Sequence, residues 1–206
     1  MNRQGVLRFF RELAKHFRHP CRVILTGAGA GVLYGRVRAT LDLDFALKFK
    51  TKIPKKKEKL WKEFEEAAEK TRAVTGIAVQ YAEDIDRWSS ITFLDYEKHT
   101  RPFQKFGALE VRLMEPGYWA IGKLARYLDP DIRDLIVVLQ RTHTSWRGLT
   151  RLLGRALWKS PKSTASFLFR RQVEDFLTTY GKQIWGSSYS SKDALRAFHH
   201  AAAIKN

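Results

Sequence analysis

The segment VILTGAGAGVLYGRVRATLDLDFAL constrains the fold more than any other part of the chain. An apolar run predicts a strand over 22–26, and alternating glycines follow it directly. Over 40–48, leucines and a phenylalanine alternate with Asp42 and Asp44, as is typical of a strand that buries one face. The segment therefore predicts two strands of one sheet, connected by a glycine-rich turn and a short helix.

Hydrophobic periodicity organises the remaining chain into an α+β front and a helical back. Residues 1–19 predict a first helix, packed on the domain through one apolar stripe. Further strands are predicted at 77–81, 90–95 and 107–114, and helices at 57–72, 117–128, 130–141, 145–158, 164–180 and 191–203. The expected fold class is α+β, with a mixed sheet and flanking helices over 1–115 and an all-helical lobe over 116–206.

Asp42 and Asp44 are the strongest candidates for chemistry. Two carboxylates at positions i and i+2 of a strand project from the same face, and their repulsion is costly unless a cation lies between them. Mg²⁺, or Mn²⁺, suits such a pair, with phosphate oxygens completing the coordination. The alternative interpretation is that both aspartates form the solvated face of an edge strand.

The glycine-rich turn predicts a phosphate-binding site. Backbone N–H groups at a helix start bind anions, which points to Gly27, Ala28 and Gly29, with Arg38 and Thr40 as further nucleotide contacts. The glycine spacing does not fit the dinucleotide fingerprint, and no glycine is followed by the Lys-Ser/Thr pair of a P-loop. A nucleoside triphosphate held beside a metal ion is the chemistry that these parts favour.

These residues resemble the signature of DNA polymerase β-like nucleotidyltransferases, in which a glycine pair is followed by Asp-hydrophobic-Asp. The ending G-x-x-R-x-T-x-D-x-D, from Gly35 to Asp44, is similar to the subgroup of AbiE-type and MenT-type toxin nucleotidyltransferases. A second stretch, YWAIGKLARYLDPDIRDLIVVL, resembles the lysine-bearing helix and short D-x-x-D helix of that subgroup. The resemblance covers about residues 20–140 and implies a nucleotidyltransferase fold.

The second stretch supplies Lys123, Asp131 and Asp134. Lys123 lies on a mostly apolar helix, which favours a phosphate contact, and the resemblance implies the same role. It also implies that an aspartate in this region is needed for activity. The structural alternatives are that Asp131 interacts with the helix dipole and that Asp134 forms a salt bridge to Lys123 or Arg126.

The sequence departs from the family pattern in two places. Ala28 replaces the second Gly/Ser, so a hydroxyl contact to phosphate is lost while the backbone N–H remains. The third carboxylate of the superfamily could be Asp95 or Glu110, and we favour Asp95 as the third catalytic carboxylate. The Asp84-x-Asp86 pair falls in a predicted turn and is interpreted as unrelated to the site.

The charge of the chain indicates a polyanionic partner. Lys and Arg number 38 against 21 Asp and Glu, a formal net charge of +17, and residues 141–206 hold twelve of the basic residues and three of the acidic ones. Phosphate contacts need such groups, and exposed aromatic rings can stack on unpaired bases. The RNA-binding candidates are Arg147, Arg151, Arg155, Lys55, Lys56 and Lys57. Most aromatic rings of the lobe are expected in its core.

Together these features predict an enzyme that uses a metal ion to transfer an NMP from an NTP to RNA. The resemblance points to the 3′ end of tRNA as the acceptor and to a toxin held by an antitoxin protein. The alternatives are a non-catalytic RNA-binding protein on a decayed nucleotidyltransferase fold and a protein-nucleotidylating enzyme. One cysteine excludes a disulfide framework, no apolar run is long enough for a membrane span, and we expect a cytoplasmic protein.

Overall fold

The computed structural model describes residues 1–35 and 42–204. Within them the chain forms one five-stranded mixed sheet and eight α-helices, so the predicted α+β class is confirmed. The described residues divide into two compact units. The sheet unit takes its residues from 1–33, 42–85 and 100–114, and the helical unit takes its residues from 34–35, 86–99 and 115–204.

The sheet has the strand order β3-β2-β1-β5-β4. Its strands are β1 (Cys21–Thr26), β2 (Asp42–Phe49), β3 (Ala78–Ala82), β4 (Thr100–Phe106) and β5 (Leu109–Met114). β1 runs antiparallel to β2 and parallel to β5, β2 is parallel to β3, and β4 is antiparallel to β5. Four of the five predicted strands are confirmed, with bounds that differ by one or two residues.

The fifth predicted strand, over 90–95, is wrong, and β4 replaces it in the sheet. In the structure, the Asp86 carboxylate accepts hydrogen bonds from the backbone N–H of Phe93 at 2.6 Å and the Thr92 hydroxyl at 3.0 Å. These bonds fold the segment into a loop. The sequence did not reveal β4 because it contains Pro102, which only an edge strand or a bulge tolerates, and β4 has both features.

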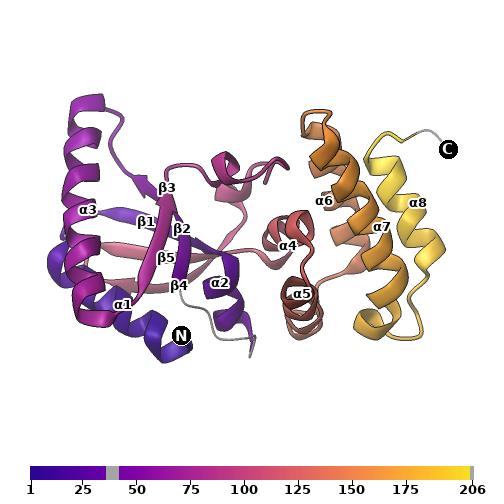
Figure 1. The fold of residues 1–206 in the computed structure, drawn as a ribbon, viewed down its shortest axis with the longest axis horizontal. Helices are drawn as coiled ribbons and strands as arrows, with labels where there is room; N and C mark the ends of the chain where they lie inside the picture. Colours follow the sequence, from indigo (N-terminus) through magenta and orange to yellow (C-terminus); the bar gives the residue numbers. More distant parts are fainter. Residues whose placement is uncertain (36–41, 205–206) are drawn as a thin grey trace. The chain divides into compact units, whose positions relative to one another are not determined.

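Two helices cover one face of the sheet, α1 (Arg3–His16) and α3 (Pro54–Thr75). Figure 1 shows both on the same side of the strands. Phe10 of α1 and Phe64 of α3 pack on Phe45 of β2, with ring centroids 6.2 and 6.1 Å apart. The first helix is therefore packed on the domain, as its apolar stripe predicted.

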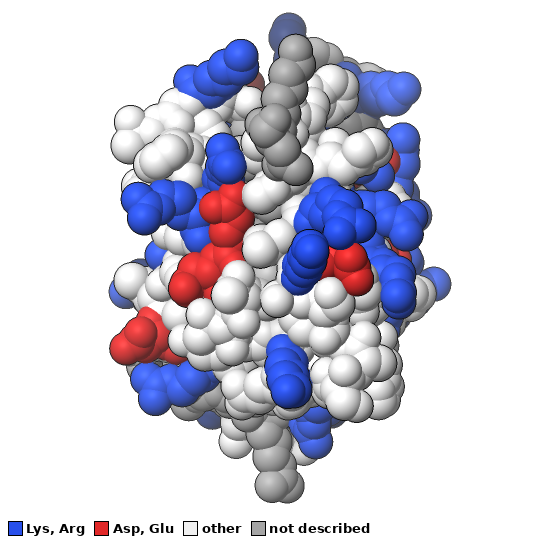
Figure 2. Space-filling view, turned by 90° about the vertical axis from the view of Figure 1, so that its right-hand side faces the viewer, with Lys and Arg blue, Asp and Glu red and all other residues white. Residues whose placement is uncertain are grey.

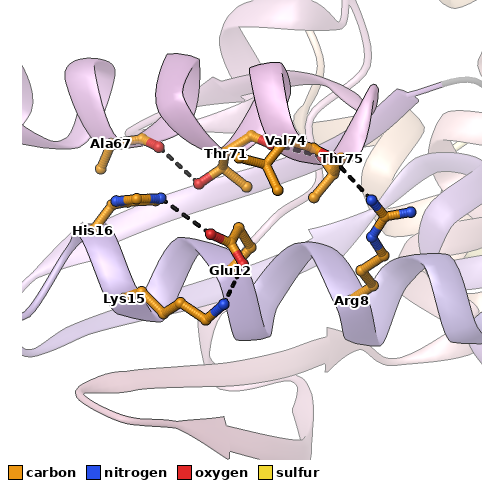
Figure 3. A network of polar contacts seen from close by, with 8 residues as sticks. All are labelled: Arg8, Glu12, Lys15, His16, Ala67, Thr71, Val74 and Thr75. Carbon is orange, nitrogen blue, oxygen red and sulfur yellow. Dashed lines mark hydrogen bonds and ion pairs between the residues drawn. The ribbon is translucent and has the colours of Figure 1, made fainter.

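A group of polar contacts lies between α1 and α3 (Figure 3). Arg8 donates a hydrogen bond to the backbone carbonyl of Val74 at 2.9 Å, which joins the two helices. Glu12 accepts hydrogen bonds from Lys15 at 2.6 Å and His16 at 3.2 Å. The bond from Lys15 is the main reason that the pKa of Glu12 lies below its usual value.

The helical unit contains five α-helices, all of which the sequence predicted. They are α4 (Pro116–Arg126), α5 (Asp129–Arg141), α6 (Trp146–Lys159), α7 (Thr164–Trp185) and α8 (Ser191–Ala201). Helices α6, α7 and α8 run side by side (Figure 1). Gly154 allows the close approach of α8, because a Cβ there would lie 2.6 Å from the Cβ of Ala201. Among the described helices, none has the length and apolar character that a membrane span requires.

Candidate functional site

The glycine-rich turn and the Asp-x-Asp strand meet at Gly27 and Asp44. β1 ends at Thr26, and α2 (Gly27–Tyr34) begins at the next residue. Gly27 has φ +58°, a conformation that residues with a Cβ rarely adopt. The antiparallel register pairs Thr26 with Asp44, and a Cβ on Gly27 would lie 2.0 Å from Oδ2 of Asp44. Only glycine therefore fits beneath this carboxylate.

The two aspartates of β2 share one face of the sheet. Both are half-buried, whereas Leu43 and Phe45 on the opposite face are fully buried. This division is the one that the alternating sequence predicted. β2 lies between β1 and β3, so the alternative interpretation of these residues as part of an edge strand is wrong. Asp42 lies opposite Ala78 and Asp44 opposite Gln80 on β3.

The carboxylate pair fits a single hard divalent cation. Residues at i and i+2 of a strand have Cα atoms about 6–7 Å apart, which lets two carboxylates on one face reach a common ion. Mg²⁺ or Mn²⁺ bound in this way would take its other ligands from water and substrate phosphate. Over the described parts of the chain, no three or more His, Cys, Asp or Glu side chains gather as a metal site.

Glu110, one candidate for the third carboxylate, lies far along the sheet from the aspartate pair. Glu110 lies opposite Arg22 in the register of β5 and β1. Arg22 comes four residues before Thr26, the residue of β1 that lies opposite Asp44. This separation is about 13 Å along the strand. The Glu110 carboxylate contacts Arg112 at 3.0 Å and Arg22 at 3.6 Å. The hydrogen bond from Arg112 is the largest cause that holds the pKa of Glu110 below its usual value.

Asp95, the favoured candidate, belongs to the helical unit. It is the N-cap residue of a short 3-10 helix, η2 (Tyr96–Lys98), and its carboxylate lies 3.7 Å from Nε2 of His99. The structure therefore places Asp95 beside a histidine, and its role as a third catalytic carboxylate stays a prediction.

The remaining residues predicted to bind nucleotide have different environments. Ala28 and Gly29 are buried in the first turn of α2. Gly29 has a structural reason to be glycine, because a Cβ there would lie 2.7 Å from a methyl carbon of Leu43. Arg38 and Thr40 lie outside the described residues.

Lys123 is buried in the helical unit between two carboxylates. Its side chain is 2% exposed, and its Nζ donates hydrogen bonds to Asp131 at 2.8 Å and Asp134 at 2.6 Å. The three residues come from α4 and α5, which pack against each other. The salt bridge from Asp134 to Lys123 was one of the structural alternatives. A phosphate contact by Lys123 would require these hydrogen bonds to rearrange.

Asp131 also binds Arg126, so its fully buried carboxylate has two cationic partners. Arg126 donates through Nε at 3.1 Å and through Nη2 at 2.7 Å. Burial by itself raises the pKa of Asp131, but the hydrogen bonds from Arg126 and Lys123 outweigh it and leave the pKa below its usual value. The carboxylate is therefore held in its ionised form.

The arginines predicted to bind RNA lie on the exposed side of α6. Arg147, Arg151 and Arg155 follow one another at intervals of four residues, and all three are exposed. Figure 2 shows the side of the helical unit that carries α7 and α8, where Lys and Arg occur in separate groups with acidic side chains among them. The three arginines are therefore accessible at the surface, and their role in RNA binding stays a prediction.

The predicted lysines 55–57 lie in the first turn of α3. Lys55 and Lys56 are exposed, whereas Lys57 is half-buried and forms an ion pair with Glu83. Cations at a helix N-terminus oppose the helix dipole, and each costs about 0.3–1 kcal/mol at low ionic strength. No acidic residue offsets them in this first turn, and the N-cap residue Ile53 has no side-chain capping bond.

Two exposed aromatic residues of the lobe were not singled out by the sequence. Trp158 and Phe167 are each 57% exposed, while Phe169 and Phe176 lie in the core. Helical periodicity could have predicted their exposure, because both residues lie outside the apolar stripe of their helices. The expectation that most rings of the lobe belong to its core did not separate these two from the rest.

Comparisons with protein-family models, with curated proteins and with solved structures found no significant match.

Proposed function

We propose that this chain is a metal-dependent nucleotidyltransferase that moves an NMP from an NTP to an RNA acceptor. The observation that carries the proposal is the contact geometry at Gly27, where the strand–glycine–helix turn lies directly against the carboxylate of Asp44. A turn able to bind phosphate and a carboxylate pair able to bind Mg²⁺ are thereby adjacent in one unit. The resemblance to polymerase β-like nucleotidyltransferases links the same two motifs.

In this proposal each motif has one role. Asp42 and Asp44 hold the metal ion through their carboxylates, on the half-buried face of β2. Bound Mg²⁺ neutralises the charge that grows on the α-phosphate and the leaving pyrophosphate. The backbone N–H groups of the first turn of α2 orient the phosphates. The attacking hydroxyl comes from the acceptor.

RNA is the proposed acceptor because the chain carries a large net positive charge. The net charge of +17 attracts phosphates and repels polycationic substrates. The exposed Lys55 and Lys56 at the start of α3 have no acidic residue beside them in the first turn, which breaks a local rule of helix stability and is often a sign of a functional site. The family resemblance narrows the acceptor to the 3′ end of tRNA and adds the proposal of a toxin neutralised by an antitoxin protein.

The test is nucleotide incorporation by the purified full chain. Protein, Mg²⁺, each labelled NTP in turn and total tRNA are incubated and separated on a denaturing gel. We expect label in RNA with the wild type, and a loss of about 100-fold or more with Asp44→Asn, since metal-bound charge stabilisation supplies several kcal/mol. Glu69→Gln, an exposed carboxylate on α3, is the matched control and should retain the wild-type rate.

The outcomes separate the proposal from its alternatives. Incorporation by Asp44→Asn at the wild-type rate would mean that the site lies elsewhere. Label that enters protein instead of RNA identifies a protein-nucleotidylating enzyme. RNA binding without any incorporation favours the second candidate function, below.

A non-catalytic RNA-binding protein on a nucleotidyltransferase-like fold is that second candidate. The observation that favours it is the burial of Lys123 between Asp131 and Asp134, which engages the proposed phosphate-binding lysine in a salt-bridge cluster. Ala28 at the second glycine position points the same way. The incorporation assay distinguishes the two candidates directly.

A further inference from the structure

Two exposed aromatic rings flank the turn that connects α6 to α7, and each lies near a cation. Lys159 Nζ lies 4.4 Å from the ring centroid of Trp158, and the Arg171 guanidinium carbon lies 6.0 Å from that of Phe167. The neighbouring Leu168 is 50% exposed. Three large apolar side chains between positions 158 and 168 are therefore exposed, and exposed apolar groups of this kind can mark a binding surface.

The turn between the two rings is rigid. Ser160 is buried, and its hydroxyl donates to the backbone carbonyl of Ala156 at 2.8 Å and accepts from the N–H of Thr92 at 3.0 Å. Ser163 and Ser166 form a reciprocal capping box at the start of α7, and the Ser166 hydroxyl also lies 2.8 Å from the carbonyl of Pro161. The two rings are therefore presented by a preorganised backbone, which lowers the entropic cost of binding.

The sequence around the two rings is strongly basic. No Asp or Glu occurs between Asp134 and Glu174 in the sequence. This interval carries eight basic residues, Arg141, Arg147, Arg151, Arg155, Lys159, Lys162, Arg170 and Arg171. The exposed face of α6 leads to Trp158, and the acid-free interval ends on α7, one turn beyond Arg170, at Glu174. Acidic side chains lie at its borders, since Glu174 contacts Arg170 at 2.7 Å and Asp86 accepts a hydrogen bond from Thr92, whose N–H donates to Ser160. The segment thus combines exposed rings with an excess of cations.

We propose that this surface, formed by Trp158, Phe167 and the basic residues of the α6–α7 region, binds single-stranded RNA by stacking unpaired bases on the two rings. Phosphates interact with Lys159, Lys162 and Arg171. Exposed rings suit unpaired nucleotides, because bases within a duplex are stacked on one another and cannot reach a side chain. An apolar protein partner would leave these cations without counter-charges. The inference deepens the proposed function, since it names unpaired nucleotides as the part of the RNA that the helical unit binds.

Binding of the full chain to fluorescently labelled RNA tests this proposal. Fluorescence anisotropy is measured without NTP, with a single-stranded twelve-nucleotide oligouridine and with a blunt duplex of the same length, over a series of salt concentrations. We expect tighter binding of the single strand. Trp158→Ala and Phe167→Ala should each weaken it about 5- to 150-fold, the range found for loss of one stacked base. Trp158→Phe should restore most of the affinity, whereas Trp158→Leu should not.

Two controls separate stacking from other effects. Val74→Ala removes an apolar side chain of similar exposure from the sheet unit and should leave the affinity unchanged. Lys159→Gln removes one cation, so it should reduce the slope of the logarithm of affinity against the logarithm of salt concentration by the amount of about one phosphate contact. Thermal unfolding by circular dichroism checks that each variant is folded.

The proposal is wrong if the single strand does not bind, if both alanine variants bind like the wild type, or if Trp158→Leu equals Trp158→Phe. If Trp158→Ala loses binding and its circular dichroism spectrum shows that it is unfolded, Trp158→Phe and Phe167→Ala test the same surface in its place. Because no NTP is present, these measurements are independent of incorporation. Absence of incorporation with binding intact refutes the transferase proposal and leaves this inference standing.

Discussion

Replacement of Lys123 by methionine tests the buried ion cluster of the helical unit most directly. Methionine is unbranched and one heavy atom shorter than lysine, so it keeps most of the apolar side chain and removes the charge and the donors. Asp134 then loses the 2.6 Å bond to the lysine, and Asp131 keeps Arg126 alone, which is itself 55% exposed at its side chain. Breaking a buried ion pair from one side costs about 3–5 kcal/mol, because the remaining charge is left in an apolar environment. For a chain of this length, that corresponds to a decrease of roughly 6–20 °C in the melting temperature.

The loss of stability caused by Lys123→Met should depend on pH in a defined direction. In the wild type the pKa of Asp131 is lower when folded than when unfolded, so its contribution to stability is present above its usual pKa and is lost as the pH falls. In Lys123→Met, the Asp131 carboxyl loses one of the two cations that lower its pKa, while burial still raises that pKa. The difference in the free energy of unfolding between the two proteins should therefore shrink when the pH is lowered from 7 to about 4. Urea unfolding at several pH values measures this difference.

A compensated variant provides the control. The triple variant Lys123→Met, Asp131→Leu and Asp134→Leu removes all three buried charges. It should recover most of the stability, since an apolar replacement of a buried cluster is often neutral or favourable. A stability loss below about 1 kcal/mol in Lys123→Met, at pH 7, would refute the structural role. The fold would then not depend on Lys123, and its side chain could contact a substrate phosphate.

Three further substitutions test the packing. Gly27→Ala should lower stability by at least about 1–2 kcal/mol because of its positive φ, and should also abolish incorporation, because the new Cβ displaces the Asp44 carboxylate. Gly154→Ala gains about 1 kcal/mol of helix propensity, but the contact with Ala201 costs about 1–3 kcal/mol, so thermal unfolding should shift to lower temperature. Ser163→Ala removes the N-cap of α7 and should lower the free energy of unfolding by about 0.5–2 kcal/mol in urea. An unchanged midpoint in any of these variants contradicts the geometry at that residue.

Local periodicity was sufficient to predict most of the elements. The alternation in β2 follows from a two-residue period, which any chain with one buried sheet face must satisfy. The apolar stripes of α1 and of the lobe helices follow from the helical period in the same way. The errors arose where a distant or local polar contact overrode propensity, as at Asp86, whose carboxylate folds the predicted strand over 90–95 into a loop. The sequence did not indicate β4 because of Pro102, which is tolerated there by the edge position and the bulge of the strand.

The sequence by itself determined the α+β class, the adjacency of glycines and Asp-x-Asp in the chain, and the excess of positive charge. Only the tertiary structure decided which groups meet. Strand register placed Asp44 against Gly27 and left Glu110 about 13 Å along the sheet, and packing of α4 on α5 paired Lys123 with its aspartates. The physical reason is that periodicity specifies which side of an element is buried, whereas contacts between distant residues depend on how whole elements pack. The same packing decides whether an aromatic ring such as Trp158 is buried or left exposed.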